Sequence, residues 1–135
     1  MTGLEILVGV LLLGVALSIA LYWASYFRGG GVRVVEADWY RRFQDAFVAA
    51  DVWLAVAAII AAVGLLTGLG FGHDFALVAA SALIFLALLD VAFNARNGLY
   101  ALVRSSGAMR VELFINVYAL VLGAAILVLG LAQAL

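Results

Sequence analysis

Four long, mostly apolar stretches constrain the fold of this chain more than any other feature. They run from about residue 4 to 26, 47 to 69, 75 to 99 and 111 to 135. A helix of about 20 apolar residues spans the hydrocarbon core of a bilayer and satisfies its own backbone hydrogen bonds where no water is present. The sequence therefore predicts an all-α, polytopic integral membrane protein, built as an antiparallel bundle of four transmembrane helices.

The composition agrees with lipid as the main surroundings of the chain. Hydrophobic residues make up 69% of the 135 residues, and charged residues make up 11%. Soluble globular domains contain about 45–50% apolar and about 25% charged residues. A chain of this length has room for one domain, so we expect residues 1–135 to form a single transmembrane domain.

Several classes of chemistry are excluded by the residue types that do not occur. The chain has no Cys, which excludes disulfides and thiolate metal sites, and no Lys, which excludes Schiff-base catalysis. His73 is the single histidine, so one chain cannot supply a multi-histidine metal or haem site. The net charge of -1 argues against nucleic acid as a partner, because phosphate binding needs a concentrated basic surface. We expect no cofactor.

The arginines predict the orientation of the helices. They lie either between the first and second stretches or near the connection of the third to the fourth: Arg28, Arg33, Arg41, Arg42, Arg96, Arg104 and Arg110. In a four-helix topology these two connections share a side of the membrane. The positive-inside rule makes both connections cytoplasmic and places both termini outside. The expected location is a plasma or inner membrane.

The first connection has the pattern of a short amphipathic interfacial helix, over about 32 to 46. Apolar side chains recur every four residues, and charged residues lie on the opposite face. Such a helix lies in the membrane interface, where it serves either as an anchor for the loop or as a lid over the cytoplasmic end of the bundle. The residues predicted at the headgroup level are Trp39, Tyr40, Arg41 and Arg42.

The main candidate for a functional residue is Asp90, within the third stretch. An ionisable side chain inside a membrane helix costs about 2.5–3.5 kcal/mol on insertion scales, so it usually faces a partner or a cavity. Asn94 and Asn97 follow at i+4 and i+7 and share one face of the helix with Asp90. We therefore expect this face to point into the cytoplasmic half of the bundle.

The other three helices carry polar residues at the same depth, whereas the outer half of the bundle has almost none. The second stretch contributes Asp51, the fourth contributes Glu112 and Asn116, and the first contributes Tyr22 and Tyr26. We predict a ligand site without a metal, formed by Asp90, Asn94, Asn97, Asp51, Glu112, Asn116, Tyr22 and Tyr26.

Three functions are compatible with this polar cluster. The favoured one is a cytoplasm-facing acidic pocket that binds or transports a small cationic, polar or amphipathic ligand. The second is an accessory subunit of a larger membrane complex, in which the cluster fixes helix packing. The third is an intramembrane lipid- or sterol-modifying enzyme, in which a buried carboxyl group moves a proton. The expected partners are the lipid bilayer, the ligand, and either further copies of the chain or a larger complex.

Overall fold

The structure, a computed structural model, describes all residues from 1 to 135 and contains helices without strands. Its long helices are α1 (Gly3–Phe27), α2 (Asp38–Thr67), α3 (Phe71–Arg96) and α4 (Gly107–Leu131), and a short 3-10 helix, η1 (Leu99–Arg104), precedes α4. Each of the four long helices is long and apolar enough to cross a membrane. The predicted all-helical fold, with four helices of membrane-spanning length and composition, is confirmed.

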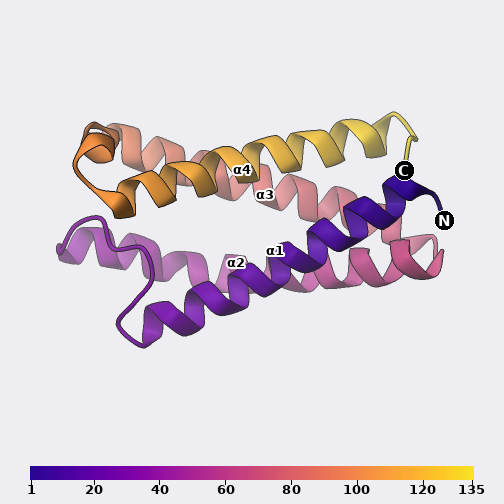
Figure 1. Ribbon diagram of the computed structural model, residues 1–135, viewed down its shortest axis with the longest axis horizontal. Coiled ribbons are helices and arrows are strands. Elements are labelled where there is room, and N and C mark those ends of the chain that lie inside the picture. The colour runs from indigo at the N-terminus through magenta and orange to yellow at the C-terminus, as the bar shows by residue number, and fades with distance from the viewer.

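The chain reverses direction at each connection, and consecutive helices pack on one another (Figure 1). The extensive helix contacts join α1 to α2, α2 to α3 and α3 to α4. Figure 1 shows α1 and α4 close together at the end that holds both chain termini and diverging toward the other end. We call this other end, which contains residues 28–37 and 97–106, the loop end of the bundle.

The packing of α2 on α3 relies on small side chains. Fully buried alanines lie on both helices: Ala57, Ala58, Ala61 and Ala62 on α2, and Ala76, Ala79 and Ala80 on α3. Small residues let helix backbones approach closely, which gains van der Waals contact where lipid gives helices no hydrophobic reason to associate. The closest approach is at Gly64 and Gly72, because a Cβ atom on either residue would overlap the backbone of the other helix.

The predicted separate interfacial helix over 32–46 is not formed. Residues 32–37 are not helical, and α2 begins at Asp38 and continues without a break through the predicted second transmembrane stretch. The sequence from Asp38 to Val63 contains neither Gly nor Pro, so no residue there interrupts the helix. The glycines at 29–31, two of them with positive φ, instead place the break immediately after α1.

The other helix ends differ from the predicted ranges by a few residues. The predicted span 4–26 becomes Gly3–Phe27, the span 75–99 becomes Phe71–Arg96, and the span 111–135 becomes Gly107–Leu131. Gly98, with a φ of 66°, takes the left-handed conformation that commonly ends a helix. Ser106 starts α4, because its side chain accepts a hydrogen bond from the amide of Met109.

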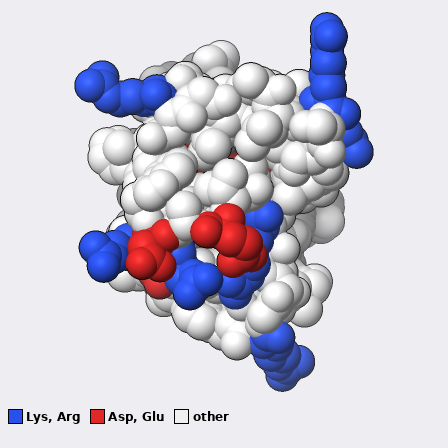
Figure 2. Space-filling model, turned by 90° about the vertical axis from the view of Figure 1, so that its left-hand side faces the viewer, with Lys and Arg blue, Asp and Glu red and all other residues white.

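The basic residues all lie at the loop end of the bundle. Figure 2 views this end face on and shows their side chains projecting from several points of its edge, with acidic side chains beside some of them. One such contact is an ion pair between Arg41 and Glu36, with 3.5 Å between the nitrogen and the oxygen. The two ends of the bundle therefore differ in the charge that sets helix orientation in a membrane.

Gly64→Ala is expected to destabilise the bundle, because the added methyl group would overlap the backbone of α3 at Gly72. Overpacking of this kind costs about 1–3 kcal/mol, so the thermal unfolding midpoint of the protein in detergent should fall by several degrees. Gly14→Ala is the matched control, since a Cβ atom at that α1 position has no neighbour within 4 Å. An unchanged midpoint for Gly64→Ala would contradict the close packing of α2 on α3.

Candidate functional site: a cavity between α1 and α4

A cavity of about 660 Å³ lies between α1 and α4 in the half of the bundle nearer the loop end. Ligand pockets commonly have volumes of about 300–1,000 Å³. All four long helices contribute to its lining, together with two residues of the segment that joins α1 to α2. Its polar lining residues include Tyr22 and Trp23 from α1, Gln44 and Asp51 from α2, Asp90 from α3, and Glu112 and Asn116 from α4.

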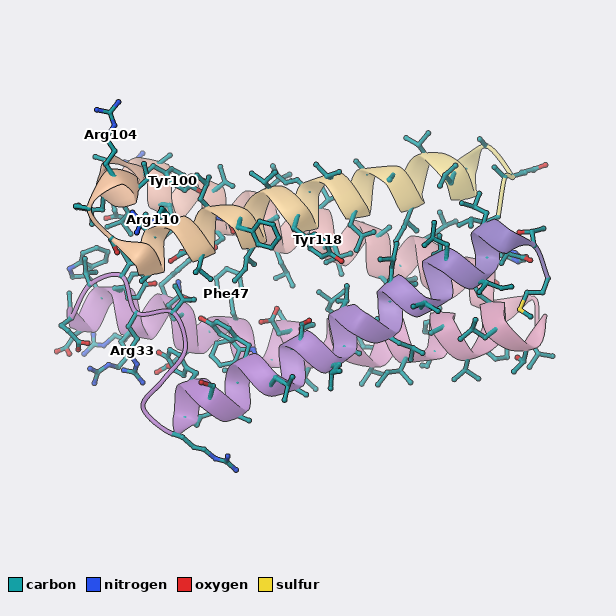
Figure 3. All side chains as sticks on the ribbon, viewed as in Figure 1. Arg33, Phe47, Tyr100, Arg104, Arg110 and Tyr118 are labelled. Atoms are coloured by element: carbon teal, nitrogen blue, oxygen red, sulfur yellow. The ribbon has the colours of Figure 1, made fainter.

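The mouth of the cavity faces sideways, toward the surface that lipid would cover. Side chains that line the cavity and are also widely exposed mark its rim. Leu21 on α1 is 62% exposed, and Phe114 and Tyr118 on α4 are 68% and 42% exposed. Figure 3 shows Phe47 and Tyr118 in the region where α1 and α4 diverge. The cavity therefore opens between α1 and α4, which do not pack extensively on each other.

The segment 28–37 is fastened across the loop end of the bundle. Arg33 donates a hydrogen bond to the carbonyl oxygen of Tyr26 at 3.0 Å, and its guanidinium lies 4.6 Å from the centre of the Tyr26 ring. The backbone N–H of Val34 donates to the hydroxyl of Tyr40 at 3.4 Å. Because this segment also supplies part of the cavity lining, it forms the wall of the cavity on the loop side.

Glu112 joins three helices through its carboxylate group. The residue is 5% exposed and accepts hydrogen bonds from the Tyr40 hydroxyl of α2 at 3.0 Å and from the Asn94 amide of α3 at 2.8 Å. Asn116, one turn further along α4, donates to the Tyr100 hydroxyl of η1 at 2.8 Å. Hydrogen bonds between helices of this kind fix their packing.

Asp51 and Asp90 have fewer partners than Glu112. Asp51 accepts a hydrogen bond from the indole N–H of Trp23 at 2.8 Å. The carboxyl group of Asp90 lies near the side chains of Glu112 and Asn116, but its Oδ1 atom is buried and has no hydrogen-bond partner. None of the three carboxyl groups pairs with an arginine. The cavity therefore holds acidic groups without a counter-ion from the chain.

Gln44 adds an unused hydrogen-bond donor to the same cavity. It lines the cavity, is 7% exposed, and has no hydrogen-bond partner for its Nε2 atom. Buried polar groups in proteins are nearly always paired, so each exception calls for an explanation. Both residues line the cavity, but their unpaired atoms are covered by other protein atoms, as is the unpaired Oδ1 of Asn94, which lies outside the cavity.

Five of the eight residues predicted to bind a ligand line the cavity: Tyr22, Asp51, Asp90, Glu112 and Asn116. The other three lie elsewhere. Asn94 is fully buried and binds Glu112, and Tyr26 donates from its hydroxyl to Asp45 at 3.0 Å. Asn97 is exposed, since it follows Arg96, the last residue of α3. Its side-chain amide donates a hydrogen bond to the backbone carbonyl oxygen of Phe93.

The residues predicted at the membrane interface divide into two groups. Trp39, Arg41 and Arg42 are exposed at the loop end. Tyr40 is buried and donates to Glu112, so it belongs to the interior of the bundle. The first turns of α2 pack partly on α3, since the ring of Phe43 stacks on that of Phe93 with their centroids 3.7 Å apart.

Sequence reasoning missed Gln44, Trp23 and Tyr100 among the residues of the site. Gln44 lies seven residues before Asp51, and this spacing places both on one face of a helix once α2 is known to start at Asp38. The sequence does not indicate which residue pairs with Trp23, although a buried indole N–H needs a hydrogen-bond acceptor. Tyr100 could not have been found, because η1 has no clear pattern in the sequence.

The terminal end of the bundle carries one polar contact between helices. Nε2 of His73 in α3 lies 2.9 Å from Oε1 of Glu5 in α1. Glu5 also forms a capping box with Thr2 at the start of α1. These groups explain how α1 begins, and none of them lines the cavity between α1 and α4.

The residues of the cavity favour recognition of a donor or a cation. No arginine or histidine lines it, so an anion would meet only like charge. No group of three or more His, Cys, Asp or Glu side chains is arranged to hold a metal ion. No protein-family model, curated protein or solved structure matches this chain. The cavity and its acidic residues are therefore the features of this chain that bear on its function.

Glu112→Leu is expected to destabilise the protein, because Tyr40 and Asn94 lose the acceptor of their hydrogen bonds. Hydrogen bonds between membrane helices contribute about 1–2 kcal/mol each, so the thermal unfolding midpoint in detergent should fall by several degrees. Asp90→Asn should lower the midpoint less than Glu112→Leu does, because Oδ1 of Asp90 has no partner and Asn keeps an acceptor oxygen of the same shape. An equal fall for both variants would contradict the division of roles between the two carboxyl groups.

Proposed function

We propose that this protein is a membrane-embedded binding protein whose cavity takes a small ligand with a positive charge or several hydrogen-bond donors. The observation that carries the proposal is a cavity of about 660 Å³ lined by three carboxyl groups and by no basic side chain. Acidic groups within a membrane helix are costly, and a cationic or donor ligand would offset that cost. Uptake or sensing of such a ligand is the use that we infer for the site.

The lining residues have distinct roles in this proposal. Asp90 is the central acceptor, because its Oδ1 atom is buried without a partner. Asp51 adds a second acceptor held in place by the indole of Trp23, and Gln44 offers a free amide donor. Tyr22 lines the cavity on α1. Glu112 contributes negative charge while its oxygens hold the helices together.

The hydrogen bonds of Glu112 favour a second candidate function. Its carboxylate is satisfied by two other helices, as expected if the polar cluster serves packing alone. The protein would then be an accessory subunit of a larger membrane complex, or an oligomer of this chain. Large hydrophobic side chains are exposed along all four helices, so lipid or other helices must cover them.

The charge distribution supports a topology for this site. We propose an antiparallel transmembrane bundle with the loop end in the cytoplasm and both termini outside, because all the basic residues lie at the loop end. The cavity then lies in the cytoplasmic half of the membrane. The proposed location is a plasma or inner membrane, where this orientation places the arginines in the cytoplasm.

Single cysteines can test this topology, because the natural chain has none. Glu36→Cys and Ser105→Cys, both exposed at the loop end, should react with a membrane-impermeant maleimide only after the cells are opened. Leu69→Cys and Ala132→Cys, both exposed at the terminal end, should react in intact cells. The reverse pattern would place the loop end outside.

Native mass spectrometry of the gently solubilised protein tests the binding function. Wild type is expected to carry a reproducible small-molecule adduct, and Asp90→Asn should lose it because the central acceptor loses its charge. Asp74→Asn is the matched control, since this exposed acid lies at the opposite end of the same helix.

The same spectra separate the two candidate functions. A wild-type protein that is always bare, or that appears only together with other subunits, would contradict the binding function and favour the accessory subunit. An adduct that persists in Asp90→Asn would remove Asp90 from the site.

A further inference from the structure

We propose that the occupant of this cavity is a single-chain amphiphile with a protonated amine head, which enters from the bilayer between α1 and α4. This inference rests on the proposed binding function and names its ligand class. It depends on three features of the cavity: the order of polar and apolar residues along it, the side on which it opens, and the sign of its charge.

The acidic lining residues lie toward the loop end, where Val32 and Phe47 also line the cavity, and the deeper lining is mostly apolar. On α2, Gln44 and Asp51 lie nearer the loop end than Leu54, and on α3, Asp90 lies nearer the loop end than Leu83. The same order holds on α4, where Glu112 and Asn116 precede Ala119, and on α1, where Val15 and Ile19 lie further from the loop end than Tyr22. The cavity is therefore acidic near the loop end and apolar toward the middle of the bundle.

This order matches the way a lipid of the loop-end leaflet stands in the membrane. From Gln44 to Leu54 the lining extends over ten helical residues, or about 15 Å along the axis. That distance is about half of the ~30 Å hydrocarbon core, which is the depth of one leaflet. An amphiphile from this leaflet would enter with its head beside the acidic groups and its chain beside Leu83 and Ala119, without turning over.

The position of the mouth supports entry from the lipid. The exposed lining residues Leu21, Phe114 and Tyr118 belong to α1 and α4 and face the surface that lipid would cover. On the loop side, the segment 28–37 forms a wall held by the hydrogen bonds of Arg33 and Val34. A ligand dissolved in lipid therefore has a direct opening, and the lining residues Ser25 and Gly31 are also exposed beside this wall.

The head group is assigned from the unpaired polar atoms. Oδ1 of Asp90 is buried without a donor, and neither Asp51 nor Glu112 has an arginine partner. An ammonium group carries up to three donors and a positive charge, so it can satisfy Asp90 and offset the neighbouring carboxylates. A phosphate or carboxylate head would add negative charge to three acidic groups. A single chain fits better than two, because the whole cavity measures about 660 Å³.

The test uses Trp23 as a reporter, since it lines the cavity and is 7% exposed. Trp39→Phe and Trp53→Phe remove the other two tryptophans, both of which are exposed. The full-length protein is placed in nanodiscs of zwitterionic lipid. Quenching of Trp23 fluorescence is then followed with dodecylamine brominated near the amine, with the equally brominated dodecanesulfonate, and with butylamine as a competitor.

The amine amphiphile is expected to quench Trp23 saturably, with an affinity at least tenfold higher than that of the sulfonate, and butylamine should not displace it. Asp90→Asn should weaken the binding of the amine at least tenfold, and Asp74→Asn should leave it unchanged. Ala119→Phe, which fills the apolar part, should also weaken the amine.

Each contrary result overturns a stated part of the proposal. Equal binding of sulfonate and amine would overturn the cationic head, and displacement by butylamine or full binding to Ala119→Phe would overturn the chain. If the amine fails to bind while native mass spectrometry still shows an adduct that depends on Asp90, the ligand class is wrong and the binding function stands. If that adduct is absent as well, both proposals fail.

Discussion

The carboxylate of Glu112 is the interaction on which the loop end of this bundle depends. It accepts hydrogen bonds from the hydroxyl group of Tyr40 in α2 and from the side-chain amide of Asn94 in α3, so it fixes α4 against both of these helices. No comparable contact ties α4 to α1, which packs mainly on α2. The three-helix contact at Glu112 thus leaves α1 free to diverge from α4, and the space between them becomes the cavity. The same interaction that joins these helices therefore lies beside the cavity.

Acidic groups within membrane helices carry a cost that must be met by partners, and here the partners are unequally divided. Glu112 has two donors, Asp51 has one, and Oδ1 of Asp90 has none. If packing were the only purpose of the cluster, the unpaired atoms of Asp90 and Gln44 would lower stability without return. Oδ1 of Asn94 is also unpaired and lies within a helix contact, so a ligand is favoured by the cavity that Asp90 and Gln44 line and not by the unpaired atoms alone.

The two halves of the bundle are built on different principles. Toward the terminal end, alanines and the contact of Gly64 with Gly72 bring α2 and α3 close together, so the core there is apolar and tightly packed. Toward the loop end, α2 and α3 are in contact through the stacked rings of Phe43 and Phe93, and α2 is joined to α4 by the hydrogen bond of Tyr40 to Glu112. The half toward the terminal end is closely packed, and the half toward the loop end contains the cavity.

The four apolar helices, the location of the seven arginines at two connections, and the shared depth of Asp51, Asp90 and Glu112 can be read from the sequence. These features follow from composition and spacing, because the length of an apolar run and the period of a helix are local properties. The packing of the helices is needed to see that Tyr40 turns inward to Glu112, that Asn97 lies past the end of α3, and that Gln44 lines the cavity. It also joined the expected interfacial helix to α2 and separated α1 from α4. Such outcomes depend on which helix faces are in contact and on where each carboxyl group finds its donors, and no periodicity in a single helix encodes either.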